Sequence, residues 1–141
     1  MSVSPMYHGS LYWVTNVDTT TVADTPIKAL GGTNGANCFG FSHSDNRLTY
    51  TGNVGRVFLV NATFSVSASG ATNSTMHIAK NGEIAVSGIK RKIGTGGDIG
   101  AGSVAVLGKL KKGDYIELWV ETDDGDDLTI EAGIITVTVA G

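Results

Sequence analysis

Apolar and polar residues alternate along the segment from Arg56 to Ala68. The even positions from 58 to 68 are all apolar, and the odd positions after Leu59 are small and polar: Asn61, Thr63, Ser65 and Ser67. Because successive side chains of a strand point to opposite faces, this period of two predicts one long strand. One of its faces is expected to be buried, and the other to carry small polar side chains.

The same pattern predicts about eight strands, which is typical of a β-sandwich. We expect eight at residues 11–15, 47–50, 56–68, 75–80, 83–89, 103–107, 114–121 and 128–139, and residues 27–30 could form a further short one. Asn81-Gly82 separates two of them and is a strong signal for a tight β-hairpin. No segment shows a sustained helical period. The fold class is therefore all-β, a single antiparallel β-sandwich or jelly roll.

The sequence divides at residue 45. Residues 1–45 hold few apolar positions, a Thr-rich stretch and a turn-rich segment at 31–37. Such a segment buries too little surface to fold alone, so we expect an extended N-terminal arm that packs on the body or on a neighbouring subunit. Residues 46–141 are expected to form the jelly-roll domain.

Two strands carry apolar residues on both faces. In the strand at 114–121, Tyr115 and Trp119 lie opposite the apolar face. In the last strand the apolar parity changes, which predicts either a bulge near Gly133 or burial of both faces. Apolar groups on an outer face favour a subunit interface over scattered surface residues. The expected interface residues are Tyr115, Trp119, Trp13, Ile135 and Val137.

Composition narrows the function classes. The chain has 141 residues, 20 glycines, 16% charged residues and a net charge of −3. This charge and the lack of a basic stripe argue against a nucleic-acid partner. The N-terminal residues do not resemble a signal peptide, and no apolar run reaches transmembrane length, so we expect a product made in a cytoplasm and no membrane partner. The single Cys38 excludes an intramolecular disulfide and is expected to be a small buried hydrophobe.

Candidate chemistry is sparse. Asp123, Asp124, Asp126 and Asp127 surround a glycine and could offer oxygens to calcium, although a solvated hairpin turn is the favoured interpretation. His8, His43 and His77 show no metal-ligand spacing, and His77 is expected at a surface or interface. The Gly-rich segment 94–102 lacks the residues of a phosphate loop and indicates an inter-strand loop. We therefore expect neither an enzyme nor a cofactor.

Four segments together resemble bacteriophage virion proteins. They are residues 46–52, residues 56–58, the Ile78-Ala-Lys-Asn-Gly82 hairpin, and Leu110-Lys-Lys-Gly-Asp-Tyr-Ile-Glu-Leu-Trp-Val120. The resemblance covers residues 46–139 and is to jelly-roll domains similar to tumour-necrosis-factor-like trimers, which occur as capsid decoration (cement) proteins and as heads of fibres. It implies a self-associating module without catalytic residues. We expect a homotrimer, with Tyr115 and Trp119 near its axis or a neighbouring subunit.

The N-terminal segment favours one of the two virion roles. A fibre head follows a shaft or coiled coil, and residues 1–45 show no heptads. We therefore expect a capsid decoration protein that stabilises the shell, with the major capsid protein as its partner and the capsid surface of the virion as its location. The alternative is a receptor-binding or fibre-tip module that recognises a host surface glycan, for which an exposed Trp13 or Trp119 would be the contact. A non-viral binding module and an unforeseen enzyme also stay open.

Overall fold

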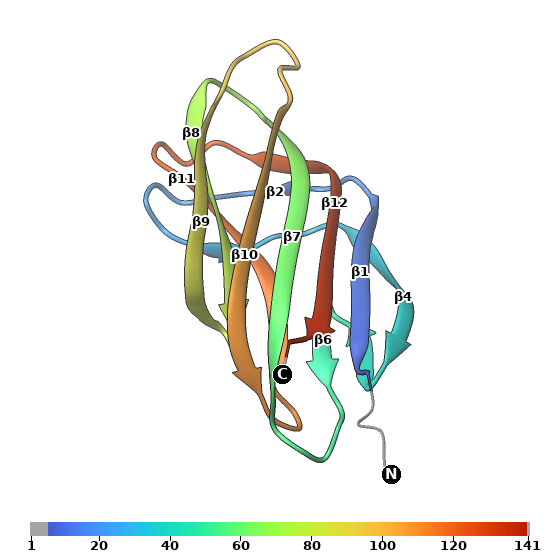
Figure 1. Ribbon diagram of the computed structural model, residues 1–141. Coiled ribbons are helices and arrows are strands. Elements are labelled where there is room, and N and C mark those ends of the chain that lie inside the picture. The colour runs from blue at the N-terminus through green and yellow to red at the C-terminus, as the bar shows by residue number, and fades with distance from the viewer. Residues whose placement is uncertain (1–5, 141) are drawn as a thin grey trace.

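Two antiparallel sheets packed face to face form the protein (Figure 1). The computed structural model describes residues 6–140, in which all the regular structure is β and no helix long enough to cross a membrane occurs. The first sheet, called the β7 sheet below, has the order β10 (Gly100–Leu110), β7 (Arg56–Ala68), β12 (Leu128–Val139), β1 (His8–Thr15) and β4 (Gly32–Phe39), with β2 (Asp18–Thr19) paired to β12. The second, the β11 sheet, has the order β5 (Phe41–Ser44), β6 (Arg47–Tyr50), β11 (Tyr115–Thr122), β8 (Thr72–Lys80) and β9 (Glu83–Ile93), with β3 (Ile27–Lys28) paired to β11.

This architecture confirms the all-β sandwich. Twelve strands lie in the described part of the chain, more than the eight expected. The difference comes mainly from the first 45 residues and from strands as short as two residues, which are too short to show a period.

Strand β7 has the two faces that its sequence predicts. Phe58, Val60, Ala62, Phe64 and Val66 are buried in the core, and the odd positions between them point outward. The strand is hydrogen-bonded along its length to β10 on one side and to β12 on the other. Its apolar face therefore forms the centre of one wall of the core.

Aromatic rings fill one end of the core. The Tyr50 and Phe58 rings have their centroids 5.0 Å apart, and those of Phe41 and Phe58 are 5.3 Å apart, both in edge-to-face geometry. Such pairs contribute about 0.5–1.5 kcal/mol beyond the area they bury. The Tyr50 hydroxyl donates to the carbonyl of Val54 at 2.7 Å, so the buried ring leaves no unpaired polar group.

The two sheets share the first 45 residues of the chain. β1 lies inside the β7 sheet, between β12 and β4, and β5 pairs with β6 in the β11 sheet. Between β1 and β4, residues 16–31 form a strap that pairs with β12 through β2 and with β11 through β3. The described part of this segment is thus built into both sheets of the sandwich.

The strap explains why Trp13 is not an exposed residue. Its side chain is 8% exposed, and its Nε1 donates to the carbonyl of Leu30 at 3.1 Å. Because the strap covers the indole, the structure gives the expected role of Trp13 as an interface or glycan-contacting residue no support.

A bulge in β12 reconciles the change of parity in that strand. The register against β7 shifts between Ile130 and Ala132, close to Gly133, as the sequence predicts. Glu131 is the additional residue, and Ile130, Ile135 and Val137 all face the core as a result. Ile135 and Val137 are fully buried within the chain, so the structure gives their predicted position on a subunit interface no support.

The hairpin between β8 and β9 has the predicted turn residues at its tip. Asn81 and Gly82 have φ angles of 53° and 81°. Positive φ at both central residues defines the type I′ turn, for which Asn-Gly is the preferred pair. This turn matches the right-handed twist of the two strands that it joins.

Candidate functional site

The outward face of the β7 sheet carries no charged side chain over its central rows. The register aligns these residues across five strands: Ala36, Ser10, Thr136, Asn61 and Ala105 in one row, then Asn34, Tyr12, Ile134, Thr63 and Ser103 in the next. A shorter row holds Ala132, Ser65 and Ala101. We call these three rows the uncharged sheet face.

Apolar side chains extend the uncharged sheet face toward one end. Leu59 and Leu107 are directly opposite each other on β7 and β10, and Leu107 is 63% exposed. Next to the bulge, a shallow hollow of ≈ 440 Å³ is lined by Thr63, Ser65, Ala101 and Ile134 among others. Small and apolar side chains over a broad face allow a second protein surface to approach the sheet closely.

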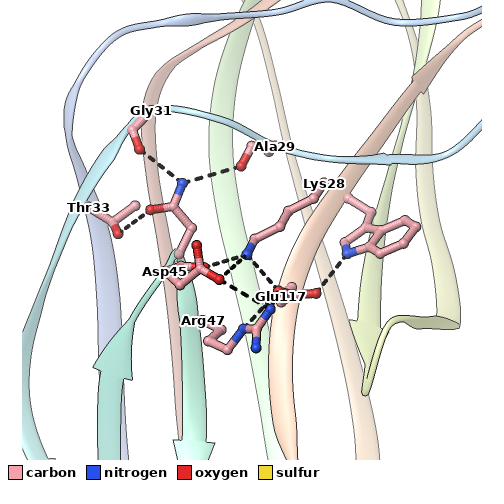
Figure 2. A network of polar contacts seen from close by, with 9 residues as sticks. Lys28, Ala29, Gly31, Thr33, Asp45, Arg47 and Glu117 are labelled. Atoms are coloured by element: carbon pink, nitrogen blue, oxygen red, sulfur yellow. Dashed lines mark hydrogen bonds and ion pairs between the residues drawn. The ribbon is translucent and has the colours of Figure 1, made fainter.

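The outward face of the β11 sheet is different, because it holds a network of ion pairs. Glu117 of β11 is only 2% exposed, and its Oε2 lies 2.8 Å from the Lys28 ammonium and 2.9 Å from Nη2 of Arg47. Its other oxygen accepts a hydrogen bond of 3.1 Å from Nε1 of Trp119. A buried carboxylate is tolerable only when its lone pairs are satisfied in this way. Figure 2 shows the cations of β3 and β6 converging on Glu117.

The turn between β5 and β6 extends this network to the strap. Asp45 pairs with both Lys28 and Arg47, at 3.6 and 3.5 Å. The amide nitrogen of Asn46 donates to the carbonyl of Gly31 at 2.9 Å, and its oxygen accepts from Thr33 at 2.7 Å (Figure 2). The network therefore ties the strap, β6 and β11 into one unit, which is a structural role.

Tyr115 and Trp119 lie on this same face of the β11 sheet and are half-buried. The guanidinium of Arg47 lies 4.0 Å from the centroid of the Tyr115 ring, and Trp119 bonds to Glu117. Both aromatic residues therefore have partners within their own chain. Their contact with a neighbouring subunit stays a prediction.

His77 is on the outer side of β8, as expected, but it is not a surface residue. It is 3% exposed, with Nε2 at 2.7 Å from Glu121 and Nδ1 at 2.9 Å from the Ser87 hydroxyl. Trp119 is its direct neighbour across the sheet. His8 and His43 lie on β1 and β5, so the structure does not bring the three histidines together.

The acidic turn at 123–127 forms a network with the first two residues of β8. Asp123 accepts hydrogen bonds from the side chain and backbone of Asn73 and from Thr72, at 2.7, 3.2 and 3.0 Å, and these bonds lower its pKa. Thr72 also donates to Asp124 at 2.7 Å. Among the described residues, no group of three or more His, Cys, Asp or Glu side chains is arranged to hold a metal. The structure thus gives the calcium hypothesis no support.

Sequence reasoning missed the Glu117 network. The alternation of β11 indicates that Glu117 shares a face with Tyr115 and Trp119, but its burial depends on Lys28 and Arg47. Lys28 precedes Glu117 by 89 positions in the sequence and belongs to a strand of only two residues. No local pattern specifies a contact of that kind.

Comparisons with known proteins place the fold. No protein-family model matches the sequence, and no curated protein is similar to it. Among solved structures, the chain is similar to an Eiger TNF from S. frugiperda, with a TM-score of 0.62, 14% identity and coverage of 98% of this chain and 94% of that one. It is also similar to murine APRIL, with a TM-score of 0.65, 11% identity and coverage of 94% and 99%.

The globular domain of the zebrafish complement 1qA protein is a third similar structure, with a TM-score of 0.56, 14% identity and coverage of 97% and 98%. None of these three is a bacteriophage protein, so they do not support the origin predicted from the sequence. At such low identity a structural likeness shows the fold alone, because one fold hosts many functions. The chain has the jelly-roll fold of TNF-like and C1q-like domains.

Proposed function

We propose that the protein is a non-enzymatic structural domain that assembles as a homotrimer through the uncharged sheet face. The observation that carries this proposal is the difference between the two sheets. Three rows of small and apolar side chains cross the β7 sheet without a charge, whereas the β11 sheet exposes ion pairs. Burying a surface without charges avoids the cost of desolvating unpaired ions.

The similarity to TNF-like and C1q-like jelly-roll domains supports this proposal, but only through the shared fold. The similarity spans nearly the whole of each compared chain. The small side chains of Thr63, Ser65 and Ala101 let two sheets approach closely, and exposed Leu107 and Ile134 provide apolar area to bury. Closed cyclic symmetry is the common way in which a domain uses one such surface without forming open filaments.

Light scattering and sedimentation at micromolar protein concentration test the assembly. The wild type is expected to be a trimer, and Thr63→Lys or Ser103→Lys should yield monomers because each places an ammonium in the interface. Ser42→Lys is the control, since Ser42 is exposed on β5 of the other sheet. A monomeric wild type would overturn the proposal. If Trp119→Ala dissociates the trimer and Thr63→Lys does not, the interface is on the β11 sheet instead.

The finer proposal is that this trimer decorates a bacteriophage capsid. Its support is the sequence resemblance over residues 46–139, and it names the major capsid protein as partner and the virion surface as location, after synthesis in the host cytoplasm. Purified protein should bind matching shells in a saturable ratio and raise their melting temperature. Binding to host cells or glycans without binding to shells would reject decoration in favour of the receptor-binding alternative.

A further inference from the structure

Charged side chains are distributed unequally between the two ends of the sandwich. One end is formed by the turns at 51–55, 81–82 and 111–114, which lie together at the bottom of Figure 1. It carries four lysines, Lys80, Lys109, Lys111 and Lys112, against the two carboxylates of Glu83 and Asp114. The opposite end carries five aspartates, Asp98, Asp123, Asp124, Asp126 and Asp127, against Lys90, Arg91 and Lys92. We call the first the lysine end.

The carboxylate of Asp114 is already used within the lysine end. Asp114 is 6% exposed and accepts hydrogen bonds from the Lys111 backbone at 2.9 Å and from Asn81 at 3.0 Å. Lys80 lies 3.7 Å from the same carboxylate and donates to the carbonyl of Lys109 at 2.9 Å. These contacts fix the position of the turn, and they leave little negative charge facing solvent.

A cleft of ≈ 310 Å³ at this end is lined by Lys80, Lys109, Lys111 and Asp114. The ammonium groups of Lys109 and Lys111 make no hydrogen bond or ion pair with the described residues. Lys112 reaches the side chain of Asn53 at 3.2 Å, which holds the two neighbouring turns together. The cleft therefore presents positive charge on a scaffold that is positioned by hydrogen bonds.

Apolar side chains are exposed at the same end. Val54 in the turn after β6 is 61% exposed, and Val57 at the start of β7 is 41% exposed. An anionic polysaccharide or a lipid headgroup offers negative charge but little apolar surface against which these valines could be buried. A protein surface, of which more than half is apolar, offers both carboxylates for the lysines and apolar area for the valines.

We propose that the lysine end binds a carboxylate-rich surface of a partner protein, with Lys109, Lys111 and Lys112 as the charged contacts and Val54 as an apolar one. This inference rests on the proposed attachment of the assembly to a partner surface. In a homotrimer whose three protomers point the same way along the symmetry axis, three lysine ends would lie side by side. Each contact could then be weak, because the first one would raise the effective concentration of the other two at the partner surface. Charge of this kind chiefly raises the rate and specificity of encounter.

Binding to immobilised polymers tests the inference without knowledge of the partner. The probes are poly-L-glutamate, a glutamate–tyrosine copolymer, heparin, and vesicles that contain phosphatidylserine. We expect the wild type to bind both glutamate polymers, the copolymer more tightly, with an affinity that falls as salt is raised above about 0.15 M. Heparin or vesicles as the tightest ligand would overturn the choice of a protein partner.

A matched pair of triple variants locates the contact. Lys109→Gln, Lys111→Gln and Lys112→Gln together should weaken binding roughly tenfold, the combined effect of three exposed ion pairs. Lys90→Gln, Arg91→Gln and Lys92→Gln remove the same charge from the other end and should leave the affinity unchanged. Equal losses in both variants would show an effect of net charge alone and reject the site. Val54→Ser should reduce the preference for the copolymer, and an unchanged preference would remove Val54 from the contact.

Failure here can be distinguished from failure of the proposed function. Light scattering reports the oligomeric state of each variant. This control matters most for Lys109, which lies outside the three rows but on the same outward face of β10, next to the Leu59–Leu107 pair. A wild-type trimer that binds neither glutamate polymer overturns this inference and leaves the trimer intact. A monomer that binds them in the predicted pattern supports the lysine end and overturns the trimer.

Discussion

Arg47 directs two N–H groups at one oxygen of Glu117: Nε at 3.0 Å and Nη2 at 2.9 Å from Oε2. Because Lys28 binds the same oxygen, Glu117 connects three strands of the β11 sheet. The two cations keep about a quarter of their side chains exposed, so their charges can return to water if the carboxylate is lost. The ion pairs of Glu117 therefore fix the position of the strap against β6 and β11.

The first prediction concerns this carboxylate. Glu117→Ala should lower the free energy of unfolding by about 2 kcal/mol, between the values for exposed and for fully buried pairs. The control is Glu83→Ala on β9, where the residue is exposed and a change below about 0.5 kcal/mol is expected. Urea denaturation of both variants measures the difference. Equal effects would show that the network contributes nothing.

The second prediction concerns Asp114. Desolvation by burial acts to raise the pKa of Asp114. Hydrogen bonds from the Lys111 backbone and the Asn81 side chain, together with the charge of Lys80, act in the opposite direction and outweigh it. The pKa of Asp114 therefore lies below its ordinary value. The ionised form is therefore bound more favourably in the folded state. This stabilisation is present above the unfolded pKa of about 3.9 and is lost as pH falls through the folded value.

Asp114→Asn should accordingly destabilise the protein by about 1.5–3 kcal/mol at neutral pH, the range for hydrogen bonds to a charged acceptor. The difference from wild type should shrink as pH falls below about 4. Thermal denaturation across this range measures it. A difference that stays constant with pH would contradict the linkage.

The third prediction concerns a buried hydroxyl in the strap. Thr21 Oγ1 lies 2.6 Å from the hydroxyl of Thr122 and donates to the carbonyl of Asp126 at 2.6 Å. Thr21→Val keeps the shape and leaves these groups unpaired, so a loss of about 1–3 kcal/mol is expected. The neighbouring Thr20 is exposed, and Thr20→Val should change stability by less than about 0.5 kcal/mol. Similar losses at both positions would show that β-branched packing dominates.

The fourth prediction concerns the acidic turn. Desolvation and the nearby charge of Asp124 raise the pKa of Asp126, so its ionised form is disfavoured in the folded state. A raised carboxyl pKa destabilises the fold at neutral pH and the penalty disappears as pH falls through the folded value. Asp126→Asn should therefore raise the melting temperature at neutral pH and have no such effect well below the ordinary carboxyl pKa.

Calcium provides a separate measurement on the same turn. Because Asp123 is engaged by Asn73 and Thr72, millimolar calcium chloride should leave the melting temperature unchanged, and the same is expected of magnesium chloride. A rise with calcium alone would revive the calcium hypothesis for the four aspartates.

Much of the sandwich could be predicted from local patterns. The alternation of β7, the Asn81-Gly82 turn and the parity change of β12 each depend on residues close in sequence, and the structure confirms all three. Trp13 and Val137 show the limit. Their apolar character was evident, but whether such a residue faces the core or a partner depends on what covers it, here the strap and the opposing sheet.

The candidate interface likewise has one part that the sequence predicts and one part that it does not. The outward polar side chains of β7 follow from its period, whereas the absence of charge across neighbouring rows depends on a register between strands far apart in the chain. The inter-strand register also decides which acidic residues meet lysines and which stay solvated, as at Glu117. A single sequence carries no local signal for that register.

The pairing of β1 with β12 has a consequence for the order of events during synthesis. His8 is opposite Thr138, so the fourth strand of the β7 sheet cannot dock until almost the whole described chain has left the ribosome. Contacts between such distant segments are slow to form, because a long loop must close first. Until β12 has been made, β7 and β1 each offer an open edge, and we expect the nascent protein to depend on chaperones or rapid chain completion to avoid aggregation.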